Sequence, residues 1–284
     1  ESRGAGLSGD AAETKLAGQT KARETAILQA VDHVALGSPA EVPHVKDIVS
    51  LGKISVFPAL DCSVVPDPPG YLPRQHLFFL GGFAHTPNIG AAVWFVENVW
   101  PTIHATLPDV EFHIIGAEAP EQIVELGNRP GVRFVGYVPD LDPVLASYRL
   151  SVAPLLFGAG IKGKLGMAMG AGVPSVVTTI AAEGMNIVDG YHALVRDDPA
   201  LFAEAVVRLY QDENLWTRVA HGGRALVEGN FGAVANQASC LRLLDRAGAL
   251  PVDLYVKYCR RISPSCFPDV APEQQIDVSI IIPA

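Results

Sequence analysis

Short apolar runs alternate with longer amphipathic segments over much of the chain. The runs are rich in Val, Ile and Phe, and most lack the apolar–polar alternation of a half-exposed strand. They therefore predict strands that are buried on both faces, as in a parallel sheet. The eight candidate strands are residues 34–36, 54–57, 77–80, 111–115, 132–135, 151–155, 175–178 and 193–195.

The segments between these runs have helical periodicity. Residues 88–105 carry apolar side chains at intervals of three and four, with Asn88 as the expected N-cap. Strands that alternate with helices predict an α/β fold, a Rossmann-like parallel sheet with helices on both faces. The other expected helices are residues 142–148, 161–171, 199–211, 213–228 and 231–247.

Two proline-rich stretches divide the chain. Residues 61–74 contain four prolines, which is typical of a stiff linker between domains. A second such break runs from 248 to 277 and is followed by the apolar run 278–284. We expect residues 1–60 to belong to one domain and 75–230 to form another. Residues 231–247 are then a separate helix, and 248–284 are a linker and the start of a further domain.

Composition excludes several classes of protein. Of the 284 residues, 49% are hydrophobic and 18% are charged, so the chain can build a large core. The formal net charge of −9 argues against binding to nucleic acid. Glu97 interrupts the best apolar run, so no transmembrane segment is expected. The four cysteines lack C-x-x-C spacing, which favours a cytoplasmic protein, in solution or at the inner face of a membrane.

The densest cluster of glycines lies in residues 157–174, between two candidate strands. A strand end, a glycine-rich turn and a helix start bring free backbone N–H groups to the carboxyl edge of a parallel sheet, where such folds bind ligands. Lys162 and Lys164 lie at the helix start, where the macrodipole disfavours cations unless an anion is bound. The spacing is neither a P-loop nor G-x-G-x-x-G. Two interpretations stay open: a phosphate-binding turn, or a connection with two solvated lysines.

A second glycine turn, residues 80–88, follows the first strand after the proline-rich segment. Gly81 and Gly82 allow a ligand to approach the backbone closely, and a helix N-terminus follows them. His85 lies in the same turn and is either a general base or an ordinary surface residue.

Four stretches, residues 77–88, 132–139, 158–164 and 172–184, together resemble a known family. Over residues 24–247 the chain resembles the C-terminal, donor-binding half of the group 1 glycosyltransferases, which are retaining GT-B enzymes of family four. The resemblance implies that residues 1–60 are the tail of an N-terminal acceptor domain and that 231–247 crosses back toward it. Residues 278–284 are similar to the opening strand of family-two glycosyltransferases, and the chain starts without Met. We therefore expect a fragment of a larger, multi-domain glycosyltransferase.

The resemblance also implies the substrates and the site. The implied donor is a UDP- or GDP-linked sugar, and the implied acceptor is a saccharide or another molecule, in cell-surface polysaccharide synthesis, with no cofactor. No metal is expected, because acidic residues that could ligate a metal are not clustered, and Asp197-Asp198-Pro199 is typical of a helix-start loop. The catalytic residue stays unassigned. The implied contacts are Gly81, Gly82, Asn88, Gly158, Gly160, Ile161, Lys162 and Lys164 with the phosphates, Gly136, Tyr137 and Val138 with the base, and Glu183 and Gly184 with the sugar.

The sequence departs from the family pattern where ligand contacts are expected. The Glu-x7-Glu pair falls on Ala159 and Met167, and the Arg and Lys that clamp the diphosphate fall on Phe83 and Asn88. Three interpretations stay open. In the first, the chain is part of an active hexosyltransferase in which the two lysines of the 158–164 turn replace the missing Arg and Lys. In the second it is a catalytically degenerate module, and in the third it is a nucleotide-sugar epimerase on the same scaffold. Glu183 is likewise either a sugar contact or a solvated loop residue.

Overall fold

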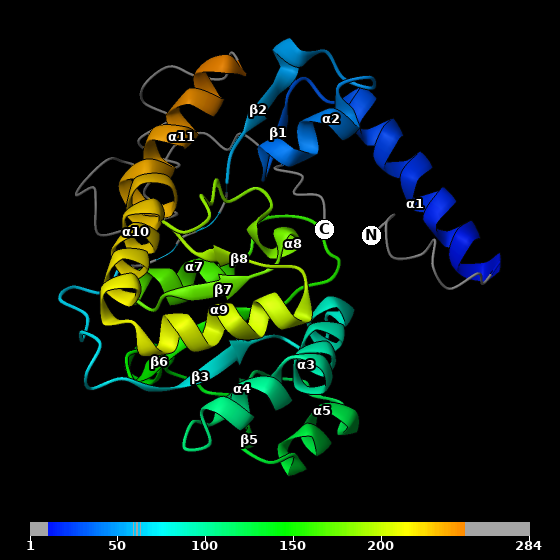
Figure 1. The fold of residues 1–284 in the computed structure, drawn as a ribbon. Helices are drawn as coiled ribbons and strands as arrows, with labels where there is room; N and C mark the ends of the chain where they lie inside the picture. The colour runs from blue at the N-terminus through cyan, green and yellow to red at the C-terminus, as the bar shows by residue number, and fades with distance from the viewer. Residues whose placement is uncertain (1–10, 59, 61, 63, 248–284) are drawn as a thin grey trace. The chain divides into compact units, whose positions relative to one another are not determined.

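The computed structural model describes residues 11–58, 60, 62 and 64–247 (Figure 1). These residues divide into two compact units. One unit takes in the described residues up to Leu60 and those from Ala233 onward, and the other runs from Asp61 to Gly232. The expected linker and further domain at residues 248–284 lie outside the described residues.

The larger unit is built on a six-stranded sheet in which every pairing is parallel. Its strand order, β5-β4-β3-β6-β7-β8, is the 3-2-1-4-5-6 order of a doubly wound Rossmann sheet. All six strands expected in this part of the chain are present, so the predicted fold class is confirmed. The strands are β3 (Gln75–Leu80), β4 (Phe112–Ile115), β5 (Val132–Gly136), β6 (Tyr148–Ala153), β7 (Ser175–Val177) and β8 (Leu194–Val195).

Helices cover both faces of this sheet. On one face α9 packs on α4, and α3 packs on α4 and α5; on the other, α10 packs on α7. In Figure 1, α9 crosses in front of the strands and α7 lies behind them. The helices of this unit are α3 (Thr86–Asn98), α4 (Trp100–Thr106), α5 (Glu121–Glu125), α6 (Asp142–Leu145), α7 (Gly163–Gly170), α8 (Thr179–Ala182), α9 (Pro199–Gln211) and α10 (Glu213–Phe231).

Each face of the sheet has its own apolar core. Phe95 of α3 packs on Phe112 of β4 with ring centroids 4.5 Å apart, and Phe202 of α9 lies 5.9 Å from Phe95. On the other face Phe78 and Ile115 belong to a buried cluster with residues of α6 and α7. Burial of large apolar side chains on both faces explains why the strands lack a polar alternation.

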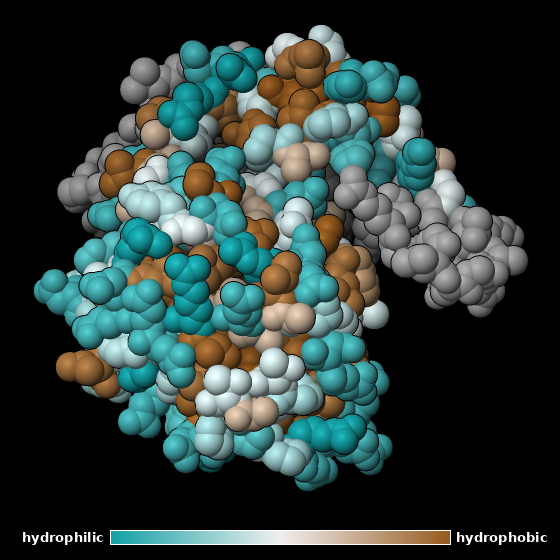
Figure 2. All heavy atoms as spheres, viewed as in Figure 1, coloured by the Kyte–Doolittle hydropathy of each residue, from teal (hydrophilic) through white to brown (hydrophobic). Residues whose placement is uncertain are grey.

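Helix α9 illustrates how the sequence pattern sets the packing. Phe202, Val206 and Leu209 are buried at spacings of three and four residues. The opposite face of the helix is polar, and hydrophilic residues dominate over α9 in the space-filling view (Figure 2). Asp198 caps the helix by accepting hydrogen bonds from the backbone N–H groups of Ala200 and Leu201, at 2.9 and 3.0 Å.

The expectation of one helix over residues 88–105 with Asn88 as N-cap is wrong. The segment forms two helices, α3 and α4, that meet at Val99. Pro101 has no N–H group to donate to the carbonyl group of residue 97, which interrupts the helical hydrogen-bond ladder. Helix α3 begins at Thr86, so Asn88 lies inside the helix and the N-cap position falls on His85.

Residues 62 and 64–74 of the proline-rich segment form no helix or strand, and they pack along the sheet and helices of the larger unit. The N–H of Val65 donates to the carbonyl of Gly170 at the end of α7, at 3.0 Å. Arg74, at the end of the segment, is completely buried. Its guanidinium donates hydrogen bonds to four backbone carbonyls, those of Pro69, Leu145, Tyr148 and Ala171.

The smaller unit contains a separate two-stranded parallel sheet in which Val34 pairs with Ile54. Helix α11 packs on strand β2. Among the described residues of this unit, Val34, Leu36, Val49 and Ile54 form a buried apolar cluster. No helix among the described residues of either unit is long and apolar enough to cross a membrane. The elements are α1 (Ala11–Ala30), which the sequence analysis did not predict, β1 (Val34–Leu36), α2 (Val42–Val45), β2 (Ile54–Val56) and α11 (Ala233–Arg246).

Candidate functional site

The two glycine turns singled out in the sequence meet at one point of the sheet. Strands β3 and β6 are hydrogen-bonded neighbours, and the chain continues from them in opposite directions across the sheet. The carboxyl edge of a doubly wound sheet binds ligands at such a switch point. The turn after β3 contains Gly81 and Gly82, and the turn after β6 contains residues 158–164. The topology therefore places both turns where a ligand is expected.

Close contacts join the two turns. The Nζ atom of Lys164 lies 3.3 Å from the place where a Cβ atom would stand on Gly82. A Cβ atom on Gly158 would lie 3.5 Å from Pro87 in the first turn of α3, and one on Gly90 would lie 3.5 Å from the ring of Phe157. The absence of a side chain at Gly82 thus leaves room for the Lys164 ammonium.

Lys164 carries an unpaired positive charge in the first turn of α7. Its Nζ atom makes no hydrogen bond or ion pair with any residue that the structure describes. The residue is exposed, yet its ammonium end is partly desolvated, and this desolvation lowers the pKa of Lys164. The positive end of the helix dipole adds a further unfavourable interaction. A bound anion would relieve both effects.

Lys162 has a different surrounding from Lys164. Its Nζ atom donates to the carbonyl groups of Gly158, Ala159 and Gly160, at 3.5, 3.3 and 2.5 Å. These contacts hold the turn in shape, together with the positive φ angles of Gly158 (+125°) and Gly160 (+77°). Contact between Lys162 and a phosphate remains a prediction, because in this conformation the side chain turns back on its own loop.

The first turn offers no positive charge of its own. Phe83 is buried with its ring centroid 6.4 Å from that of Phe79. Asn88 donates from Nδ2 to the carbonyl oxygen of Gly82 at 2.7 Å, which fixes the turn against α3. The exposed ring of His85 has no hydrogen-bond partner among the described residues, so nothing that the structure describes orients it as a general base. Lys164 is therefore the cation that faces this turn.

The loop expected to hold the base follows β5. Gly136 has a φ angle of +79°, and its carbonyl accepts a hydrogen bond from the N–H of Gly116 at 2.8 Å. Tyr137 is 69% exposed at the edge of the sheet. Val138 and Met167 of α7 pack against the same buried cluster. Met167, on which the second Glu of the Glu-x7-Glu pattern falls, is thus apolar in its contacts as well as in its residue type.

The loop after β7 is tied to the strand end of β6. Thr178 is buried, and its hydroxyl donates to the carbonyl of Leu155 at 2.5 Å. The same hydroxyl accepts a hydrogen bond from the N–H of Ala181, which caps α8. Glu183 and Gly184 follow at the end of α8, with Gly184 at a φ angle of +80°. Thr178 therefore fixes the expected sugar-side loop next to the loop that leads into the 158–164 turn.

A further residue at this edge was missed in the sequence. Asp197 accepts hydrogen bonds from the N–H and the hydroxyl of Thr179, at 2.8 and 2.6 Å. The neighbouring Asp198 caps α9, as the sequence pattern indicated. The sequence did contain a signal for this contact. Two acidic residues stand side by side before a helix, and one carboxylate is enough to cap that helix, which leaves the other for a different contact.

Two features of the site edge bear on charge. Among the side chains that the structure describes, no three of His, Cys, Asp or Glu are grouped so that they could hold a metal ion. Lys164 and the start of α7 supply positive charge at this edge.

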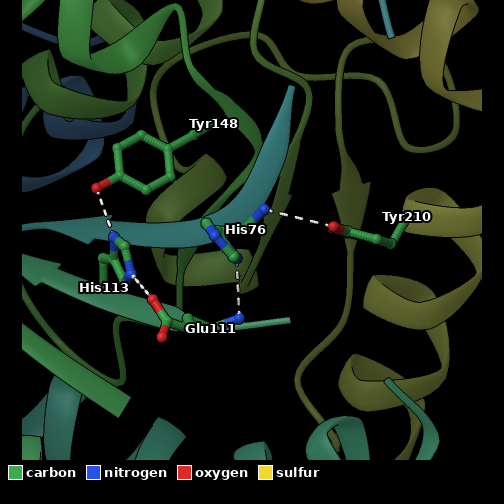
Figure 3. Close-up of polar contacts among 5 residues, drawn as sticks. All are labelled: His76, Glu111, His113, Tyr148 and Tyr210. Carbon is green, nitrogen blue, oxygen red and sulfur yellow. Dashed lines mark hydrogen bonds and ion pairs between the residues drawn. The ribbon is translucent and has the colours of Figure 1, made fainter. Parts of the chain in front are cut away.

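A second polar cluster lies at the opposite, amino edge of the sheet (Figure 3). The ring of His113 lies between the carboxylate of Glu111 and the hydroxyl of Tyr148, each at 2.7 Å. Since a carboxylate only accepts, Nε2 donates to Glu111 and Nδ1 accepts from Tyr148, which is the neutral ring. Burial lowers the pKa of His113 and raises that of Tyr148 to about 12. The backbone N–H of Glu111 donates to His76, whose own N–H donates to Tyr210.

Comparison with known proteins agrees with the fold of the larger unit. A family model described as "Glycosyl transferases group 1" matches residues 74–212. Over these residues the chain is similar to the group 1 glycosyl transferases. A curated relative is the Klebsiella pneumoniae "Uncharacterized 44.6 kDa protein in cps region". It is 21% identical over 184 residues, which cover 57% of this chain and 47% of the relative.

Two solved glycosyltransferases share the fold of this chain. Staphylococcus aureus TarM, whose structure was solved with UDP bound, has a TM-score of 0.68 at 14% identity, covering 79% of this chain and 46% of TarM. WaaG, a glycosyltransferase involved in lipopolysaccharide biosynthesis, has a TM-score of 0.55 at 14% identity, covering 73% of this chain and 61% of WaaG. The chain thus spans about half the length of the first relatives that it matches.

Proposed function

We propose that the larger unit binds the diphosphate of a nucleotide sugar and that the protein transfers the sugar to a saccharide acceptor. The observation that carries this proposal is the Lys164 ammonium. It faces Gly82 at the switch point of the sheet, partly desolvated, with no carboxylate partner among the described residues. The similarity of residues 74–212 to the group 1 glycosyl transferases supports the reaction class.

The diphosphate lies at the 158–164 turn in this proposal. The first N–H groups of α7 have no partner within the helix, and the N–H groups of Gly160 and Ile161 precede them. Gly82 lets the phosphate approach the backbone on the other side. Helix α8 is a poorer candidate, because Asp197 already accepts the N–H of Thr179 and repels an anion.

Charge stabilisation is the chemical contribution of this unit. When the sugar leaves the nucleotide, negative charge grows on the diphosphate while positive charge grows at the anomeric carbon. Lys164 and the helix start stabilise the leaving diphosphate electrostatically, which requires no nucleophile in this unit. The loop of Gly136, Tyr137 and Val138 is assigned to the base, and the loop of Glu183 and Gly184 to the sugar. A retaining outcome is expected by resemblance to family four.

Two of the solved relatives support a nucleotide donor and a polysaccharide product. TarM was solved with UDP, and WaaG takes part in lipopolysaccharide biosynthesis. We therefore assign a UDP- or GDP-linked donor and a role in cell-surface polysaccharide synthesis. The acceptor contacts are assigned to parts of the protein beyond the larger unit.

A degenerate module is the second candidate function. The apolar packing of Met167, the burial of Phe83 and the engagement of Asn88 with the Gly82 carbonyl favour it. Such a module keeps the fold and loses affinity for the nucleotide. The two candidates therefore differ in a measurable property of the chain.

Direct titration of UDP and GDP into the chain tests the proposed function. Saturable binding of either nucleotide is expected, and competition by the matching nucleotide sugar should follow. Absence of binding to both nucleotides and to their sugar conjugates would favour the degenerate module. Product analysis with a bound donor separates transfer from epimerisation, because an epimerase returns a nucleotide sugar and needs no acceptor.

A further inference from the structure

The carboxylate of Asp197 joins two loops that leave neighbouring strands. Asp197 follows β8, and Thr179 follows β7. Both oxygens of the carboxylate are used, one by the N–H of Thr179 at 2.8 Å and the other by its hydroxyl at 2.6 Å. Two charge-assisted hydrogen bonds to one residue fix the orientation of the loop as well as its distance from Asp197.

We propose that Asp197 is a positioning residue that holds the 178–184 loop in place for the sugar of the donor. The inference rests on the proposed function, since it concerns the same donor site. Asp197 acts through Thr179 and touches no substrate.

Two hydrogen bonds hold the start of the loop. Thr178 bonds to the carbonyl of Leu155, which leads into the 158–164 turn. The next residue, Thr179, bonds to Asp197. The hydroxyl of Thr178 also accepts a hydrogen bond from the N–H of Ala181, so the first turn of the loop is fixed relative to the proposed phosphate position. Such a fixed loop contributes to binding only where the ligand reaches past the phosphates.

The alternative role for Asp197 is a plain helix cap, and the contacts argue against it. Asp198 already accepts hydrogen bonds from Ala200 and Leu201 at the start of α9. Asp197 instead reaches a residue 18 positions earlier in the chain. Both side chains are exposed, so little stability depends on this pair. The pair is thus better suited to orienting a loop than to holding the fold together.

The test compares the affinity for a nucleotide sugar with the affinity for the bare diphosphate. The probes are UDP with UDP-glucose, UDP-galactose and UDP-N-acetylglucosamine, and GDP with GDP-mannose. The variants are then measured with the diphosphate and sugar conjugate that bind the wild-type chain most tightly. Asp197→Ala is expected to weaken the binding of the nucleotide sugar about fivefold to tenfold. Affinity for the diphosphate should stay within about twofold.

Matched variants separate positioning from stability. Thr179→Val keeps the shape but loses the hydroxyl and should reproduce part of the effect, whereas Thr179→Ser should retain wild-type affinity. Asp198→Ala removes a helix cap, so it should lower the melting temperature without changing the ratio of the two affinities. If Asp197→Ala does not fold, the two Thr179 variants give the answer.

Two results overturn the inference while leaving the proposed function intact. One is an equal loss of affinity for the diphosphate and its sugar conjugate, and the other is no loss for either, in a chain that still binds both. A wild-type chain that binds neither probe overturns the proposed function and this inference with it.

Discussion

The ammonium nitrogen of Lys164 lies 3.3 Å from the place where a Cβ atom would stand on Gly82. A methyl group there would press on the ammonium and move it by a few tenths of an ångström. We predict that Gly82→Ala weakens binding of a nucleoside diphosphate several-fold, because a charge-assisted contact depends on distance and direction. Calorimetric titration of UDP and GDP measures the effect.

Gly229→Ala is the matched control for this substitution. Gly229 lies in α10, and a Cβ atom there would meet no atom within 4 Å. Alanine should raise helix stability by about 0.5–1 kcal/mol and leave nucleotide affinity unchanged. Equal nucleotide affinity of Gly82→Ala and Gly229→Ala would show that Gly82 does not border the phosphates.

Binding of the donor should need no divalent cation. The described residues group no three potential metal ligands, and lysine with helix N–H groups supplies the positive charge. Titrations of UDP and GDP with EDTA and with magnesium or manganese should give affinities within about threefold of each other. Strict dependence on either metal would overturn this prediction.

The buried guanidinium of Arg74 should be essential for the fold. Burial lowers its pKa to about 10, so it stays charged at neutral pH, and four carbonyl groups accept its hydrogen bonds. Arg74→Met leaves buried carbonyls without partners, which should cost about 3 kcal/mol or more of unfolding free energy. Denaturant unfolding measures it. Arg133→Met, at an exposed position, should change the unfolding free energy by less than about 0.5 kcal/mol.

The cluster around His113 should make the fold sensitive to mild acid. Burial holds the pKa of His113 below its ordinary value of 6.5, so the unfolded chain takes up the proton first as the pH falls. Unfolding free energy therefore declines as the pH falls below about 6.5. Urea midpoints at pH 7.5, 6.5 and 5.5 should show this decline in the wild type and a smaller one in His113→Gln.

Other groups set the limits of this pH experiment. His33 and His192 also have lowered pKa values through burial, so part of the decline should remain in the variant. The lowered pKa of Glu111 contributes stability that is lost only at more acidic pH. Identical slopes for His113→Gln and the wild type between pH 7.5 and 5.5 would exclude His113 as a source of the acid sensitivity.

Much of the fold could be predicted because it depends on local patterns. Buried strands need unbroken apolar runs, and all eight runs became strands. Helix ends were predicted where side chains cap them, as at Asp198. The break at Val99 was missed because the apolar period continues through it, whereas the missing N–H of Pro101 ends the hydrogen-bond ladder.

The site was predictable only as far as glycines and charges mark it. Topology brought Gly82 and Lys164 together, since the two turns lie at the switch point. The bond from Thr179 to Asp197 joins residues far apart in sequence, and no local pattern encodes it. The hydrogen bond from the Lys162 ammonium to a carbonyl group of its own turn depends likewise on the folded shape of that turn.

Lys164 is the residue on which the account of the donor site depends. Its folded-state pKa is lowered, so a bound diphosphate should raise that pKa and favour the charged form. Removing one charge-assisted contact costs roughly 1.5–3 kcal/mol, which is about a tenfold to hundredfold loss of affinity. Thermal stability without ligand should be unchanged or slightly higher in Lys164→Ala, because the charge has no partner among the described residues.

Isothermal titration calorimetry of UDP and GDP with the wild type and Lys164→Ala tests the central claim most directly. The account predicts that the wild type binds one of the two nucleotides and that Lys164→Ala binds it at least about tenfold more weakly, with an unchanged melting temperature. Equal affinities of the two proteins would contradict the placement of the phosphates at this turn, and no binding by the wild type would contradict a donor site altogether.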